Sequence, residues 1–178
     1  MSTRSTGHMR NPGTARARGF TLVELMVTVA VLVVLIAIAV PSFDSIRLST
    51  RLSGYATSLV SGSQLARSEA IKRNAPVTLC ASANGTSCST NGQWEAGWIV
   101  LSGTQVLRVE SAAASGYLLR EAGGASSIVF QATGMGAGQS RINICRATPS
   151  ANQSRAVSIS ATGRTNVTKS NDGSCASS

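Results

Sequence analysis

One stretch of the sequence restricts the fold more than any other: the apolar run from Phe20 to Val40, FTLVELMVTVAVLVVLIAIAV. As a helix, these 21 residues would be about 31 Å long, enough to cross a bilayer once. Residues 1–19 are polar and carry four arginines and no acid, so the positive-inside rule places the N-terminus in the cytoplasm. The sequence therefore predicts a single membrane helix followed by an exported part.

Two ordinary explanations of this run fit poorly. A secretory signal peptide has an apolar core of about 7–15 residues, followed by a small-x-small cleavage site. Here the run is longer and ends at Pro41-Ser42-Phe43, and its small residue, Gly19, precedes it. A plain membrane anchor does not explain Glu24, because an ionisable side chain costs about 2.5–3.5 kcal/mol near the centre of a membrane helix and less near an interface.

Residues 18–25, RGFTLVEL, resemble the prepilin cleavage and methylation signature of type IV pilins and type II secretion pseudopilins. The resemblance implies that residues 1–19 are a leader, which a prepilin peptidase removes by cutting between Gly19 and Phe20 on the cytoplasmic side. The new Phe20 amine would then be methylated. Glu24 would face the charged N-terminal amine of a neighbouring subunit during assembly, because a paired charge costs far less in hydrocarbon than a single one.

Pro41 closes the predicted membrane and filament-core segment, residues 20–41. It removes a backbone donor and crowds the preceding turn of a helix. In pilins, a proline at this place marks a kink or a melted stretch. A simple end of the membrane helix is equally compatible with the residue.

Residues 42–75 predict an amphipathic helix. Apolar residues recur every three or four positions, as is typical of a helix with one buried face: Leu48, Leu52, Tyr55, Leu59, Ala66 and Ala70. Asn74 should end this helix, since it is followed by Ala75-Pro76 and the residue before a proline avoids the α region.

Residues 76–178 change to short extended segments separated by Gly-, Asn- and Ser-rich turns. The predicted strands are Val77–Cys80, Trp94–Leu101, Gln105–Glu110, Tyr117–Arg120, Ser127–Gln131, Arg141–Arg146, Arg155–Ser160 and Arg164–Thr168. We expect an α+β fold in which the long helix packs on a C-terminal antiparallel β-sheet or two-sheet domain. Trp94 and Trp98 should differ in burial, because residues four apart share a face only if the strand is regular.

The four cysteines contain no Cys-x-x-Cys pair, and the single histidine, His8, is distant in sequence, which argues against a metal site. In an exported domain, four cysteines predict two disulfides, for which three pairings are possible. We favour Cys80–Cys88, which closes a short polar loop, and Cys145–Cys175, which ties down the C-terminal tail. The longer loop would contribute roughly 3–4 kcal/mol.

The sequence offers little for catalysis. Without residues 1–19 it has no histidine, and the carboxylates after Glu24 are scattered singly with no acid–base pair. The glycine-rich residues 134–138 precede a predicted strand, whereas a phosphate-binding loop opens onto a helix. We therefore expect no enzymatic activity and no cofactor.

The globular half resembles the GspH/FimT group of minor pilins. The motifs that carry this resemblance are residues 66–71 (ARSEAI), 77–80 (VTLC), 92–100 (GQWEAGWIV), 142–145 (INIC) and 157–164 (VSISATGR). It implies a FimT/FimU-like minor pilin that helps to initiate or cap a type IV pilus, or alternatively a GspH-type minor pseudopilin of type II secretion. The chain would cross the inner membrane once with its β domain in the periplasm. Its partners would be prepilin peptidase, the inner membrane and, through the N-terminal helix, other pilins or pseudopilins. Its final location would be the tip of a pilus or pseudopilus.

The basic residues are concentrated at the two ends of the chain. The net charge is +9, and residues 141–178 hold five basic side chains against one acid. FimT members linked to DNA uptake carry a Gly-Arg-x-Arg motif in this region, where the chain has Gly163-Arg164-Thr165-Asn166, followed by Lys169. The resemblance implies weak, non-specific DNA binding at the tip through Arg164 and Lys169, since basic surfaces attract phosphates. The alternative is a solvated basic face.

Overall fold

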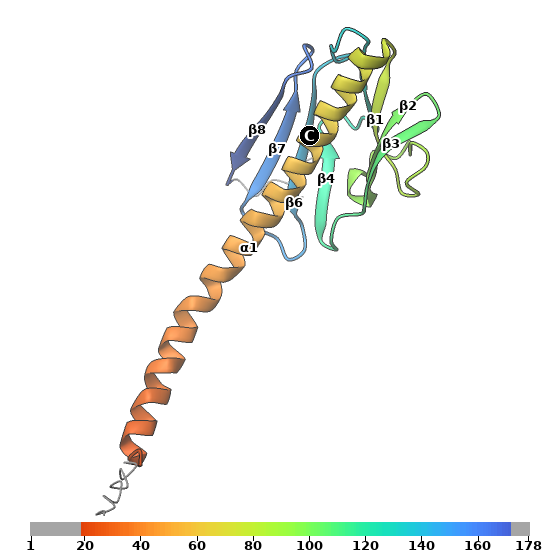
Figure 1. Cartoon of the computed structure of the whole chain (residues 1–178). Helices are drawn as coiled ribbons and strands as arrows, with labels where there is room; N and C mark the ends of the chain where they lie inside the picture. The colour runs from red at the N-terminus through yellow and green to blue at the C-terminus, as the bar shows by residue number, and fades with distance from the viewer. Residues whose placement is uncertain (1–18, 172–178) are drawn as a thin grey trace, which may run out of the picture. The chain divides into compact units, whose positions relative to one another are not determined.

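The computed structural model describes residues 19–171, without the side chains of residues 38–42. The chain divides into two compact units, Met1–Ser42 and Phe43–Ser178. Helix α1, Leu22–Arg73, contributes to both units (Figure 1). Most of the predicted leader, residues 1–18, lies outside the described residues.

In the first unit, α1 begins directly after Thr21. The Thr21 hydroxyl accepts the backbone N–H of Glu24 at 3.2 Å, which is the usual side-chain cap of a helix N-terminus. Glu24 lies in the first turn, where a negative charge suits the positive end of the helix dipole. Sequence reasoning did not anticipate this cap, although the Thr-x-x-Glu spacing is the signal of a capping box.

Every described side chain from Phe20 to Ala37 is exposed in this unit. Across the part of the chain that the structure describes, no helix is long and apolar enough to cross a membrane. The predicted crossing segment also includes residues 38–41, whose side chains lie outside the described residues, as does the predicted kink at Pro41.

In the second unit, the remainder of α1 buries the predicted apolar face. Five of the six predicted positions are buried, at 0–4% exposure: Leu48, Leu52, Leu59, Ala66 and Ala70. Tyr55 is only partly buried, and its neighbour Ala56 is buried instead. The helix ends at Arg73, and Asn74 takes a positive φ of 49°. The N–H of Ala75 then bonds the carbonyl of Ala70 at 3.2 Å, which closes the C-terminus. The predicted end at Asn74 is confirmed.

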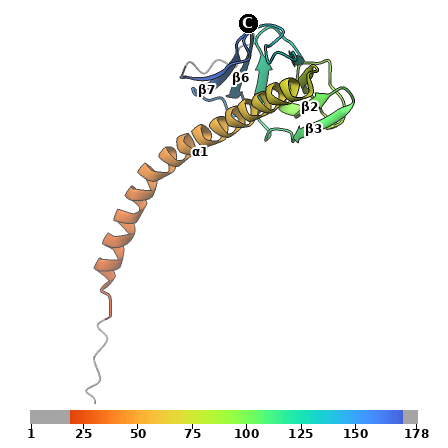
Figure 2. The same ribbon diagram turned by 45° about the horizontal axis from the view of Figure 1, so that its top comes forward.

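Two four-stranded antiparallel sheets follow α1. The first has the order β3-β2-β1-β5 and consists of Gln105–Glu110, Trp98–Ser102, Val77–Ala81 and Ser127–Phe130. The second has the order β4-β6-β7-β8 and consists of Tyr117–Glu121, Ser140–Arg146, Ser154–Ile159 and Thr165–Ser170. In both views, β7 lies to one side of α1, and β2 and β3 lie to the other (Figures 1 and 2). The α+β fold is confirmed, with two sheets.

A single apolar core joins α1 to both sheets. Leu59 of the helix belongs to the same cluster as Leu79 and Phe130 of the first sheet and Ile144 and Val157 of the second, and all five are completely buried. Each fully buried side chain of this size contributes about 1.5–3 kcal/mol relative to an exposed one. The helix is therefore the central element of the core.

The predicted strand Trp94–Leu101 is wrong in its first half. Residues Trp94–Ala96 form a 3₁₀ turn, η1, and the strand β2 begins only at Trp98. Between them, Gly97 has a φ of 114°, and a Cβ there would lie 2.8 Å from the carbonyl oxygen of Glu110. Only glycine fits such a position.

The expectation that Trp94 and Trp98 differ in burial is also wrong. Both side chains are buried, at 1% and 2% exposure. The indole N–H of Trp94 donates to the Ala125 carbonyl at 2.9 Å. The Trp98 ring packs against Gly62 of α1 and lies 5.2 Å from the guanidinium carbon of Arg108. The change of direction at Gly97 turns both rings inward.

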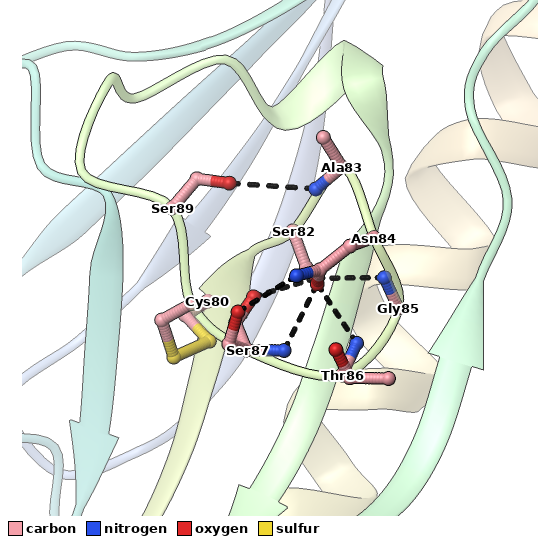
Figure 3. The surroundings of a disulfide bond; sticks show 9 residues. Cys80, Ser82, Ala83, Asn84, Gly85, Thr86, Ser87 and Ser89 are labelled. Carbon is pink, nitrogen blue, oxygen red and sulfur yellow. Dashed lines mark hydrogen bonds between the residues drawn. A yellow bond between two sulfur atoms is a disulfide. The ribbon is translucent and has the colours of Figure 1, made fainter.

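The disulfide Cys80–Cys88 is confirmed, and its Cα atoms are 5.5 Å apart. Figure 3 shows the polar loop that it closes. The amide oxygen of Asn84 accepts the backbone N–H groups of Thr86 and Ser87 at 2.9 and 3.0 Å, and the Ser82 hydroxyl donates to the Ser87 carbonyl at 2.7 Å. The other predicted pair, Cys145–Cys175, stays a prediction because Cys175 lies outside the described residues.

Candidate functional site

The predicted processing motif lies at the start of the described chain. Gly19 and Phe20 precede α1 in non-helical conformation, and Phe20 is 80% exposed. Glu24 is exposed in the first turn of α1. This arrangement leaves the Gly19–Phe20 bond outside regular secondary structure. Cleavage, methylation and the pairing of Glu24 with a neighbour stay predictions.

The predicted basic region does not form one continuous face, because two of its five cations bind α1. The Arg146 guanidinium donates to both carboxylate oxygens of Asp44, at 3.4 and 3.1 Å. This hydrogen bond lowers the pKa of Asp44 and raises that of Arg146. Arg155 is 7% exposed and donates to the Ser49 hydroxyl at 2.9 Å. Both arginines therefore hold the second sheet against the helix.

Of the remaining three cations, two line the same hollow. Arg141 at the start of β6 and Arg164 after the β7–β8 turn border an open hollow of about 970 Å³. Ser158 and Asn166 also line it. All four side chains reach it from neighbouring strands or the turn between them, because β6 pairs with β7 and β7 with β8.

The predicted partner of Arg164, Lys169, does not line this hollow. In the register of the sheet, Arg141 is opposite Ser158 and Ser158 is opposite Asn166, whereas Lys169 is opposite Arg155. Directly opposite residues point to the same face of a sheet, and successive residues alternate. Lys169 therefore points to the face on which Arg155 binds the helix. The cation that shares the hollow with Arg164 is Arg141, which sequence reasoning missed.

The β7–β8 turn holds Arg164 in place. The backbone N–H of Ser160 bonds the Arg164 carbonyl at 2.9 Å, and the Arg164 N–H donates to the Ser160 hydroxyl at 3.1 Å. Gly163 has a φ of 74°, and a Cβ there would collide with the carbonyl oxygen of Gly134 and approach the Arg67 side chain to 3.3 Å. The glycine before Arg164 thus has a structural reason.

A buried carboxylate forms one wall of the hollow. Glu121, at 7% exposure, accepts the N–H groups of Gly123 and Ala125 at 2.7 and 2.9 Å, and the hydroxyl of Ser140 and the N–H of Arg141 at 3.1 and 3.3 Å. Burial raises the pKa of Glu121, but these four hydrogen bonds together outweigh it, so the pKa is lowered. The side chain stays ionised at neutral pH, which leaves the hollow with two positive charges and one negative.

The described residues hold no group of three or more histidine, cysteine or acidic side chains that could bind a metal ion. What the hollow can do chemically is bind an anion weakly. Its arginines supply charged donors, and its serine, threonine and asparagine side chains supply neutral ones.

Comparisons with known proteins assign the two halves of the chain separately. The sequence profile of the family described as Type II transport protein GspH matches residues 55–163, more than half of the chain. The chain belongs to the GspH family. The profile of the prokaryotic N-terminal methylation motif matches residues 14–40, so this GspH-family chain begins with the motif that Gly19, Phe20 and Glu24 predict.

Solved structures agree with the fold of this GspH-family chain. The type IV minor pilin FimU of Pseudomonas aeruginosa aligns with a TM-score of 0.54 at 22% identity, over 67% of this chain and 90% of FimU. The minor pseudopilin EpsH of the Vibrio cholerae type 2 secretion system aligns with a TM-score of 0.51 at 13% identity, over 66% of this chain and 96% of EpsH. No curated protein sequence matches the chain significantly. The chain thus has the fold that a type IV minor pilin and a type 2 secretion pseudopilin share.

Proposed function

We propose that the chain is the precursor of a minor pilin that acts by assembly and not by catalysis. Prepilin peptidase removes residues 1–19, the Phe20 amine is methylated, and residues 20–41 anchor the protein in the inner membrane with its second unit in the periplasm. The filament then takes up this segment as part of its core. Near the tip, the subunit helps to initiate or cap the filament.

One observation carries this proposal: a methylation motif at residues 14–40 precedes a GspH unit at residues 55–163. The exposed apolar side chains between Phe20 and Ala37 support it. An apolar surface of this extent is not stable in water and needs a membrane or a protein partner. A helix that passes from the bilayer into a filament core has both in succession.

Within this class we propose a type IV pilus, with type II secretion as the alternative. FimU and EpsH both share the fold, so the fold does not distinguish the two machines. The feature that favours the pilus is the hollow lined by Arg141 and Arg164, because it gives a filament tip a surface that attracts phosphate. Binding of extracellular DNA at the tip is therefore our second candidate function.

The assembly role is tested with Glu24→Ala in cells that make filaments. The substitution should leave membrane insertion intact or improve it, because it removes an ionisable group from an apolar helix. Incorporation into sheared filaments should fall, because the carboxylate that pairs with the Phe20 amine of the neighbour is lost.

Glu69→Ala is the matched control, since Glu69 lies on the same helix and pairs with Arg73 at 2.6 Å within the second unit. It should leave incorporation unchanged. Wild-type amounts of the Glu24→Ala protein in filaments would refute the pairing role.

A further inference from the structure

We propose that Arg141 and Arg164 form a two-arginine clamp, across the hollow, for the phosphodiester backbone of duplex DNA, and that Lys169 takes no part in it. This inference rests on the proposed DNA-binding function. It names the residues and the form of nucleic acid, neither of which the sequence motif gives. The motif itself covers only Arg164, and the next cation along the sequence is Lys169.

The sheet register determines which basic residues face the hollow. Arg141, Ser158 and Asn166 lie opposite one another across β6, β7 and β8, and all three line the hollow. Lys169 follows Asn166 by three positions on the same strand, so it points to the other face. A ligand in the hollow therefore meets Arg141 and Arg164, and no extended strand can bring Lys169 to the same face.

Hydrogen bonds within the second unit hold the backbone of both arginines in position. The backbone of Arg164 is fixed by its two bonds to Ser160 and by Gly163 in the turn. Arg141 is fixed by its N–H bond to Glu121, and its Nε donates to the amide oxygen of Asn143 at 3.2 Å. A guanidinium held through Nε still directs terminal N–H groups outward, and their fork suits a phosphate.

The lining of the hollow favours the backbone over the bases. Among the described residues that line it, none is aromatic, and the neutral ones are mainly hydroxyl and amide side chains. Proteins that bind single strands stack bases on aromatic rings, which contribute about 1–3 kcal/mol per base. Without such rings the hollow gains nothing from unpaired bases, so duplex phosphates are the ligand it fits.

The strength of the clamp follows from its charge. Two phosphate contacts give a slope of log K against log salt of about −1.8, and removal of one contact should reduce it to about −0.9. At 50 mM salt, one such contact corresponds to about a tenfold change in affinity. The ionised Glu121 in the wall opposes anions and makes binding weak.

The experiment measures binding of a fluorescein-labelled 30-base-pair duplex, and of one of its strands, by anisotropy between 50 and 200 mM salt. The whole protein is purified from membranes in a neutral detergent, so that the N-terminus is common to all variants. Arg141→Gln and Arg164→Gln should each lower duplex affinity about tenfold at 50 mM salt and lower the slope by about 0.9. Lys169→Gln removes the same charge and should change neither by more than about twofold.

Two variants that add an arginine at neighbouring positions of β8 provide an independent readout. Asn166→Arg adds a cation to the hollow and should raise the slope to about −2.7, whereas Val167→Arg adds it to the opposite face and should leave the slope unchanged. Wild-type protein that binds no duplex at 50 mM salt would overturn both the DNA-binding function and the clamp. Duplex binding that Lys169→Gln weakens as much as Arg141→Gln, or tighter binding to the single strand, would overturn the clamp alone.

Discussion

Replacing Gly163 with alanine should cost far more stability than its position in a surface turn suggests. The backbone φ of 74° lies in the left-handed region, where a non-glycine residue costs about 1–3 kcal/mol. The new Cβ would also collide with the Gly134 carbonyl and press on Arg67, and overpacking of this kind costs about 1–3 kcal/mol more. We expect the free energy of unfolding of the second unit to fall by about 2–6 kcal/mol, and its Tm by roughly 10–20 °C.

Gly124→Ala separates the two contributions to this loss. Gly124 has nearly the same φ, 78°, but a Cβ there has no neighbour within 4 Å. It should therefore lose only the conformational part, about 1–3 kcal/mol, and so less than Gly163→Ala loses. Thermal unfolding followed by tryptophan emission measures both variants, because Trp94 and Trp98 are buried in the second unit. Equal losses for the two variants, within about 0.5 kcal/mol, would refute the steric argument.

Two further predictions concern the buried polar groups and the disulfide. Glu121 has a lowered pKa in the folded protein, so its stabilisation is present above its ordinary pKa of 4.5 and is lost as the pH falls through the folded value. Glu121→Gln should thus be less stable than wild type at pH 7, and the gap should narrow by pH 3 in urea titrations; a constant gap would contradict the assignment. Replacing Cys80 and Cys88 together with serine should lower the free energy of unfolding by about 2.5 kcal/mol, the loop-entropy value for a separation of 8 residues. Urea titrations of oxidised wild type and the double variant measure it, and equal midpoints would show that the loop is held by its hydrogen bonds alone.

Much of the fold could be predicted because its signals are local. The end of α1 at Arg73 follows from Asn74 and Pro76, and the predicted strand Gln105–Glu110 matches β3 residue for residue. The other strands except β2 differ by one or two residues at their ends. Side-chain alternation and turn residues are local features of the sequence, so they can be recognised without knowledge of tertiary contacts.

The parts that could not be predicted depend on distant partners. Arg146 and Arg155 read as members of a basic surface, but they bind Asp44 and Ser49, which lie 102 and 106 residues earlier. Likewise, Arg164 and Arg141 line the same hollow because of the strand order β6-β7-β8, which no local pattern specifies. The Glu110 carbonyl that excludes any side chain from Gly97 belongs to the neighbouring strand β3, so the break between the 3₁₀ turn and β2 is not evident from the local sequence.

Whether the chain is a prepilin can be measured by the intact mass of the protein extracted from membranes of a strain with active prepilin peptidase. A prepilin should yield a chain that begins at Phe20 and carries one added methyl group. Gly19→Val should instead retain residues 1–19, because the peptidase must accept a residue without a Cβ next to the bond it cuts. A wild-type chain that keeps its leader in that strain would contradict the account.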